Sequence, residues 1–325
     1  MGAPKLFVLT VLLVYWNQDI EMAEGYTFIE HYAGCGMMTD TLRSRGCGPA
    51  AKLDIEYSPG MDILSPGGFA THIVSVLRGS EDGFINWHGI KCSTWVAISR
   101  PTTLRSLLDP LGNRELPCVE ESNVMASRLA LILVLVLALS GTFIVEQPGS
   151  SLLWRHPRLQ WVCGLVKVFR CNFWMMFFNS KSPKRTSLWS NSRHICKFWM
   201  GKLTRKLRED LKKKYPDFST TIKYKNKAGK TRFHGSKQLR STQSYTREFS
   251  LKMADIFPEI LNEASSVDKQ PREDAAKELE TLWKQDESWG DTWEDAHLRE
   301  VTRYLLGAKG LVIPPRWAWI IPSHL

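Results

Sequence analysis

The sequence predicts an α/β protein with a doubly wound, mainly parallel sheet and a C-terminal helical extension. Strand-like and helix-like segments alternate from residue 26 to residue 190, and glycines mark several of their ends. The chain has 325 residues, 43% of them apolar, which is enough for one large domain or two ordinary ones. Aromatic residues at 11% and charged residues at 23% exclude a wholly disordered chain and a simple coiled coil.

The alternating order follows from apolar runs that are separated by turn residues. Ala33–Gly36 is a glycine turn after the first strand, Gly46 ends the first helix, and Gly141 stops the long apolar helix. Strands are predicted at Tyr26–Tyr32, Ala50–Ile55, Phe84–Trp87, Thr142–Val145 and within Val166–Phe178, and helices at Met37–Arg45, Phe69–Leu77, 123–139 and Trp154–Trp161. This order calls for parallel strands that are joined by helices on both faces of the sheet.

Two apolar runs bear on the location of the protein. Leu6–Trp16 has the length of a signal-peptide core, but no small-x-small cleavage site follows it. Leu129–Val145 is slightly short of the roughly 20 residues of a membrane helix, and Ser140–Gly141 divides it, so no stable membrane insertion is expected. The seven cysteines form no Cys-x-x-Cys pair, which favours reduced thiols. An intracellular location is therefore predicted, with export as the alternative.

The positive charge is concentrated in one block. Residues 181–252 carry 21 Lys and Arg against four Asp and Glu, whereas residues 253–325 are net acidic. This block predicts nucleic acid as a partner, because clustered cations bind a polyanion by counterion release. The alternative is a solvated, partly disordered arm. The predicted organisation is an apolar segment 1–24, an α/β domain 25–200, a basic arm or insertion 201–252 and an acidic, Trp-containing helical extension 253–325.

Small and acidic residues gather where the predicted strands end. Gly34 and Gly36 follow the first strand, Asp54 follows the second, and Glu146 follows the fourth. In a parallel sheet these ends share one edge, where ligands bind. A glycine turn before a helix, with an acid on the next strand, predicts a cofactor of the adenosine type. The alternative is that Asp54 and Asp62 are ordinary turn residues.

Six segments together resemble one known family. Glu30–Gly36 resembles the Asp-x-Phe-Ala-Gly-x-Gly motif of the cytosine-5 DNA methyltransferases, which belong to the class I S-adenosylmethionine-dependent superfamily. The other segments follow in that family's order: Leu53–Ile55, Met61–Ile63, Gly89–Thr94, Phe143–Pro148 and Phe178–Arg185. The resemblance covers about residues 26–190. The sequence departs from the family pattern at Lys91, which stands where the family has proline, and at Gln147–Pro148, which stand for Asn-Val.

The resemblance implies a Rossmann-like methyltransferase fold, S-adenosylmethionine as cofactor, no metal, and methylation of cytosine in DNA. DNA rather than RNA is then the expected substrate, and the nucleus rather than the cytoplasm the expected location. It also implies a cofactor site at Tyr32, Gly34, Gly36, Asp54 and Asp62, and a catalytic set of Cys92 as nucleophile, Glu146 as hydrogen-bond partner of the base and Arg185 as a positioning cation. Lys91 is expected to lower the pKa of the Cys92 thiol.

Each of these residues also has a plainer interpretation. Cys92 suits a small buried apolar residue, Glu146 a turn-capping carboxylate, and Tyr32 a core aromatic. Two alternative functions therefore stay open. The first is an enzyme of the same fold that methylates another substrate, and the second is a catalytically inactive relative that binds nucleic acid through residues 181–252.

Overall fold

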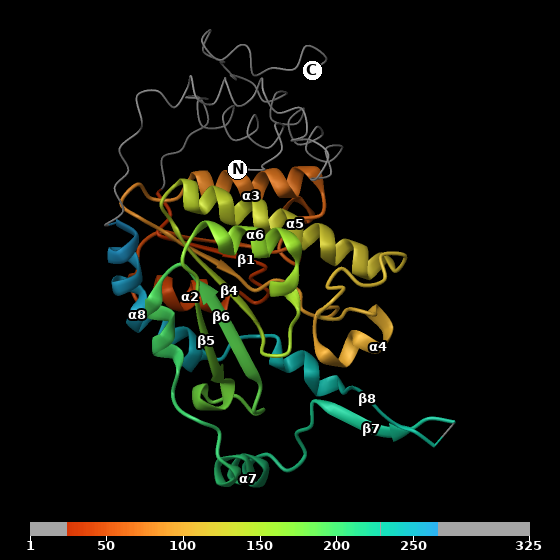
Figure 1. Cartoon of the computed structure of the whole chain (residues 1–325). Helices are drawn as coiled ribbons and strands as arrows, with labels where there is room; N and C mark the ends of the chain where they lie inside the picture. Colours follow the sequence, from red (N-terminus) through yellow and green to blue (C-terminus); the bar gives the residue numbers. More distant parts are fainter. Residues whose placement is uncertain (1–24, 228, 266–325) are drawn as a thin grey trace.

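The computed structural model describes residues 25–227 and 229–265, and its centre is a six-stranded sheet in the order β2-β1-β3-β4-β6-β5 (Figure 1). β1 to β4 are parallel, and β6 is antiparallel to both β4 and β5. The strands are β1 Phe28–His31, β2 Ala50–Leu53, β3 Ile85–His88, β4 Thr142–Pro148, β5 Phe169–Trp174 and β6 Arg185–Ser190. The predicted mixed α/β fold with a mainly parallel sheet is therefore present.

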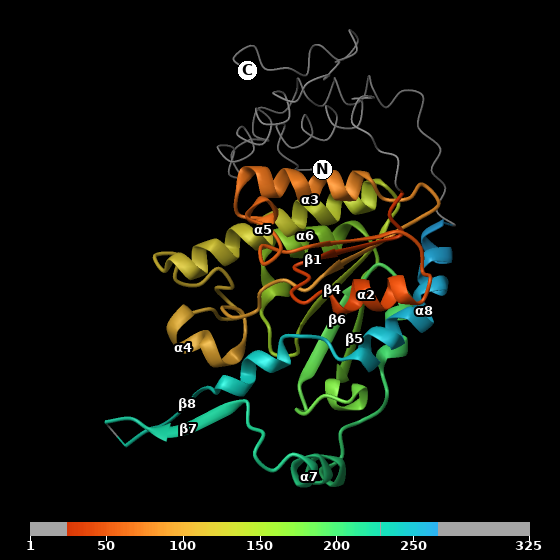
Figure 2. The same ribbon diagram turned by 180° about the vertical axis from the view of Figure 1, so that it is seen from behind.

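Helices cover both faces of this sheet (Figures 1 and 2). α3, α5 and α6 lie on one face, and α2 and α8 lie on the other. The α-helices are α2 Met37–Ser44, α3 Pro66–Leu77, α4 Arg100–Thr103, α5 Pro117–Ala138, α6 Pro157–Leu165, α7 Arg205–Lys214 and α8 Arg247–Ser265. Short 3₁₀ helices are η1 Pro59–Met61, η2 Ala97–Ser99, η3 Leu153–Arg155, η4 Met175–Phe178, η5 Arg193–Phe198 and η6 Lys237–Thr242.

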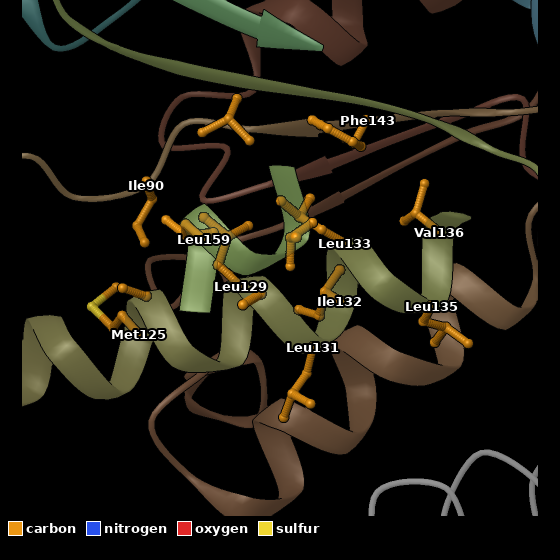
Figure 3. Packing of buried hydrophobic residues seen from close by; sticks show 14 of the residues in the cluster. Ile90, Met125, Leu129, Leu131, Ile132, Leu133, Leu135, Val136, Phe143 and Leu159 are labelled. Atoms are coloured by element: carbon orange, nitrogen blue, oxygen red, sulfur yellow. The ribbon is translucent and has the colours of Figure 1, made fainter. Parts of the chain in front are cut away.

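α5 supplies much of the core on the first face. Leu129, Leu133 and Val136 point toward the sheet, where Phe143 of β4 lies, and Leu131 points to the opposite side (Figure 3). Among the described residues, α5 is the one helix long and apolar enough to cross a membrane, but most of that stretch is buried inside the protein. Such burial is typical of a helix in a protein core.

The second face is closed by α8, which packs against α2 and the sheet. Phe249 of α8 stacks on Phe173 of β5 at a centroid distance of 5.7 Å and meets Phe198 at 4.9 Å. The boundary predicted between residues 252 and 253 falls inside α8, because the apolar residues of this helix continue across it. Leu6–Trp16 and most of the predicted extension lie outside the described residues.

Most of the basic segment projects from the body (Figure 1). α7 has no buried residue, and the two-stranded hairpin of β7 (Thr221–Lys225) and β8 (Thr231–Gly235) is exposed at every position. The beginning of the 181–252 block is different, since β6 pairs with β4 inside the sheet and η5 packs beside it.

Three differences from the predicted helix boundaries involve proline. α3 begins at Pro66 because Ser65 Oγ caps it by accepting the Gly68 amide at 2.9 Å. α5 begins at Pro117 rather than at residue 123. The predicted helix Trp154–Trp161 is divided into η3 and α6, because Pro157 has no amide proton to continue the first turn.

Candidate active site at the carboxyl edge of the sheet

The parallel strands β1 to β4 end at one edge, and most of the predicted site residues lie there. Tyr32 and Gly34 follow β1, Asp54 follows β2, and Glu146 lies near the end of β4. Cys92 comes four residues after the end of β3. The sheet topology therefore brings these residues to a common rim, because parallel strands present their carboxyl ends on the same side.

The glycine turn after β1 is tied to the acid after β2. The Gly34 amide donates to Asp54 Oδ2 at 2.8 Å, and the Glu56 amide donates to Asp54 Oδ1 at 2.9 Å. Gly36 precedes α2 with a φ of 68°, and a side chain there would meet Lys52 and Tyr57 at less than 3 Å. A Cβ on Gly34 would meet nothing within 4 Å, so the space beside this turn is open.

Glu30 is a buried carboxylate beneath the turn. Its Oε2 accepts the Thr39 amide at 2.9 Å and the Thr39 hydroxyl at 2.5 Å, in the first turn of α2. Burial raises the pKa of Glu30 to about 7, although both hydrogen bonds act in the opposite direction. Its Oε1 is buried and has no hydrogen-bond partner in the described part of the chain.

Tyr32 and Asp62 occupy the next part of the rim. Tyr32 has a φ of 56°, and its hydroxyl is buried with no hydrogen-bond partner among residues 25–227 and 229–265. Burial raises the pKa of this hydroxyl. Asp62 Oδ1 accepts the Leu64 amide at 2.9 Å, and the Asp62 carbonyl accepts the Ser65 hydroxyl. Asp62 thus shapes the turn before α3, which is its plainer interpretation.

Gly89 lies between this half of the rim and the half that contains Cys92 and Glu146. Its amide donates to the His31 carbonyl at 3.2 Å. A Cβ at Gly89 would lie 2.8 Å from the Tyr245 hydroxyl and 3.3 Å from the Tyr32 carbonyl oxygen. A side chain at residue 89 would therefore have to displace the Tyr245 hydroxyl, which favours glycine at this position.

Cys92, Glu146, Lys184 and Tyr245 form the second half of the rim. Lys184 Nζ lies 3.5 Å from Glu146 Oε1, and Trp87 Nε1 donates to the Tyr245 hydroxyl at 3.1 Å. Burial and the nearby Glu146 carboxylate raise the pKa of Tyr245. Cys92 is close enough to feel the charges of both Lys184 and Glu146. The carboxylate of Glu146, the ammonium of Lys184, the phenol of Tyr245 and the thiol of Cys92 therefore lie close together.

The pKa of the Cys92 thiol is shifted in the direction opposite to the predicted one. Burial raises the pKa of Cys92, and the cation that acts in the opposite direction is Lys184. Lys91 is exposed. The prediction that Lys91 lowers this pKa is therefore wrong, because the neighbouring side chain is directed to solvent while the thiol is desolvated.

Arg185 does not join this cluster. It is exposed at the start of β6 and pairs in register with Trp174 of β5, on the strand face opposite to that of Lys184. Its guanidinium lies 6.0 Å from the Trp174 ring centroid, and Arg170 is near enough to feel its charge. Successive side chains of a strand point to opposite faces, so the neighbour Lys184 takes the position near Glu146.

Two groups of this site were absent from the predicted set. Lys184 precedes a strand of alternating side chains, and that alternation separates it from Arg185. Tyr245 is 153 residues from Cys92 in the chain, as their numbers show, and no local pattern links them. Only the packing of the segment before α8 brings it to the rim.

A chain of buried histidines lies behind the rim, between β1, β3 and α3. His31 stacks on His88 at a centroid distance of 4.6 Å and on His72 at 4.8 Å. His31 Nδ1 lies 2.5 Å from His72 Nδ1, Asn86 Nδ2 lies 3.0 Å from His31 Nε2, and His72 Nε2 lies 3.1 Å from the Met61 carbonyl. Burial lowers the pKa of all three histidines, that of His72 to about 4.

A cavity of about 700 Å³ runs between β2 and α3, and its lining includes Leu53 and Met61 but neither Gly34 nor Asp54. Within the described residues, no group of three or more His, Cys, Asp and Glu side chains is arranged to hold a metal ion.

No protein-family model, no curated protein and no solved structure matches this chain.

Proposed function

We propose that this protein is an S-adenosylmethionine-dependent methyltransferase of Rossmann-like fold that acts on a nucleobase, with cytosine in DNA as the specific substrate. The observation that carries the proposal is the continuity of the rim. The linked Gly34–Asp54 turn meets, across Gly89, the cluster of Cys92 and Glu146.

The residues beside the glycine turn suit an adenosine-type cofactor. The space at Gly34 is open to a ligand, and the Asp54 carboxylate holds the adjoining backbone while keeping further lone pairs for hydroxyl groups. Tyr32 offers a buried hydroxyl without a partner in the described region, and Glu30 offers a carboxylate oxygen in the same condition. The cofactor would supply an electrophilic methyl group.

The half of the rim with Cys92 and Glu146 would supply the other groups. The Cys92 sulfur would attack carbon 6 of cytosine, which makes carbon 5 nucleophilic enough to take the methyl group; loss of the carbon-5 proton would then release the sulfur. The Glu146 carboxyl would hydrogen-bond the ring nitrogen and the exocyclic amine of the base. Lys184, next to both groups, would favour the thiolate that attacks and balance the negative charge of Glu146. The Arg185 side chain takes no part, since it faces the opposite side of the sheet.

Titration with S-adenosylhomocysteine tests the cofactor site. Calorimetry with the wild-type protein should give a saturable heat. Asp54→Ala removes the acceptor of the Gly34 amide and should weaken binding at least tenfold, roughly 1.4 kcal/mol. Asp82→Ala, an exposed acid in the turn before β3, is the control and should bind as the wild type does. Absence of heat with the wild type would remove the enzyme proposals and leave a relative that only binds nucleic acid.

A second candidate, methylation of another substrate without a covalent intermediate, is favoured by the desolvated thiol of Cys92. Substitution of Cys92 separates the two. If Cys92 is the nucleophile, wild-type protein forms a covalent adduct with DNA that contains a mechanism-trapping cytosine analogue, and Cys92→Ser forms none. Cys118→Ser, at an exposed cysteine, is the matched control and should still form the adduct. Retention of methyl transfer by Cys92→Ser would support the second candidate.

A further inference from the structure

A second concave surface follows the outer edge of β5. It is a groove of about 670 Å³ between that strand and the segment after η5. We call it the β5 groove, and its lining consists of Arg170, Cys171, Asn172, Trp174, Arg185, Cys196, Trp199, Gly201, Lys202 and Leu203. The methyl-transfer proposal uses none of these residues.

The groove is strongly basic. Arg170, Arg185 and Lys202 line it, and no Asp or Glu is among its lining residues. Burial lowers the pKa of Arg170, and the charges of Arg185 and Arg155 lower it further. Within the described part of the chain, none of the three lining cations forms an ion pair. Like charges held together without a counter-charge favour an anionic ligand.

Aromatic surface lies beside these cations. The Trp199 side chain is 58% exposed, although tryptophan usually buries most of its surface. Trp174 lies across the groove, with the Arg185 guanidinium 6.0 Å from its ring centroid. Gly201 has a φ of 114°, a conformation that favours glycine and turns the chain between Trp199 and Lys202.

Exposed tryptophan and uncompensated cations together suit a single-stranded nucleic acid. Its phosphates can pair with guanidinium and ammonium groups, and its unpaired bases can stack on indole rings. A duplex keeps its bases stacked on one another, so it would leave Trp199 without a partner. An acidic peptide would satisfy the cations but would make no use of the exposed indole.

We propose that the β5 groove binds single-stranded nucleic acid, with Arg170, Arg185 and Lys202 on phosphates and Trp199 stacked on a base. This surface lies on the edge strand, away from Cys92 and Glu146, and so goes beyond the methyl-transfer site. It would hold a strand beside the sheet whether or not a base is methylated at the rim.

Fluorescence anisotropy with a labelled oligothymidine of about 12 nucleotides tests the proposal on the full-length chain. Trp199→Ala should weaken binding about tenfold, because a base–aromatic stack is lost. The double variant Arg170→Gln/Arg185→Gln should lower the slope of log Kd against log salt by about 1.4, since each phosphate contact on a single strand contributes about 0.7. A duplex of the same length should bind more weakly than the single strand.

The control removes the same kind of charge from the exposed helix α7. Lys212→Gln/Lys213→Gln should leave the affinity of the oligothymidine within about twofold of the wild type. Loss of binding in this α7 variant, with unchanged binding in the groove variants, would overturn the proposal in favour of the basic arm. Equal affinity for an acidic peptide would overturn it too. Melting curves show whether the variants are folded, and S-adenosylhomocysteine titration reports separately on the rim.

Discussion

Acidification from pH 7.5 to pH 5 is expected to lower the free energy of unfolding by roughly 6 kcal/mol, which is comparable to the whole stability of many domains. The cause is the set of buried histidines. Burial lowers the pKa of His31, His72 and His88, and it lowers that of His156 to about 3. These rings stay neutral in the folded state, whereas an unfolded chain binds protons below pH 6.5.

The hydrogen bonds among these histidines favour the neutral rings, as burial does. With Asn86 donating to His31 Nε2, His31 Nδ1 donates to His72 Nδ1, and His72 Nε2 donates to the Met61 carbonyl. Both rings are then neutral and each nitrogen has one role. In this arrangement, a proton added to either ring would place two N–H groups against each other.

The size of the effect follows from linkage. Each neutral histidine costs about 2 kcal/mol at pH 5, because only the unfolded state takes up its proton between pH 6.5 and pH 5. Glu30 has a pKa of about 7 in the folded state, so the fall in pH protonates it there first. This raises the free energy of unfolding by about 2 kcal/mol over the same range. Four histidines and one glutamate leave the net loss given above.

Urea unfolding at several pH values measures this loss, and one substitution isolates a single ring. His88 stacks on His31, and neither of its nitrogens has a hydrogen-bond partner among the described residues. His88→Phe should therefore reduce the acid-induced loss by about 2 kcal/mol. His234→Phe, on the exposed hairpin, should leave the pH profile unaltered. A wild-type stability that stays flat between pH 7 and pH 5 would contradict the neutral histidine chain.

Arg105→Met is expected to lower the free energy of unfolding by roughly 3–5 kcal/mol, because buried acceptors lose their donor. Arg105 is 2% exposed, and its guanidinium carbon lies 3.4 Å from the Trp95 ring centroid. Burial lowers its pKa to about 10, so it stays charged at neutral pH. Its terminal nitrogens donate to the carbonyls of Pro110, Leu111 and Val119, to Asn123 Oδ1 and to Thr94 Oγ1.

Arg105 also links the loop before α5 to the loop that carries Cys92, through Thr94. Arg105→Met should thus increase amide hydrogen exchange at residues 92–95, in addition to lowering stability in urea. Arg114→Met, at an exposed arginine of the same loop, should change stability by less than about 0.5 kcal/mol. Similar losses in the two variants would mean that the buried network does not stabilise the fold.

Much of the fold could be predicted because its signals are local. The apolar run from residue 129 and the stop at Gly141 define α5 and β4 without reference to distant residues. The acid after β2 is near the turn after β1 because parallel strands with helical crossovers end at one edge. The neighbouring positions Lys184 and Arg185 were harder, since one step of strand register decides which of them faces Glu146.

The sequence by itself determined the alternation of strands and helices from β1 to β5, the location of the basic block and the rim on which Gly34, Asp54 and Glu146 lie. The tertiary structure alone decided that Tyr245 lies beside Glu146, that His31 and His72 are hydrogen-bonded to each other, and that Arg185 lines a groove on the edge of β5. The physical reason is that periodicity and turn chemistry act between near neighbours in the chain. Desolvation, like-charge repulsion and hydrogen-bond direction depend on which distant side chains pack together.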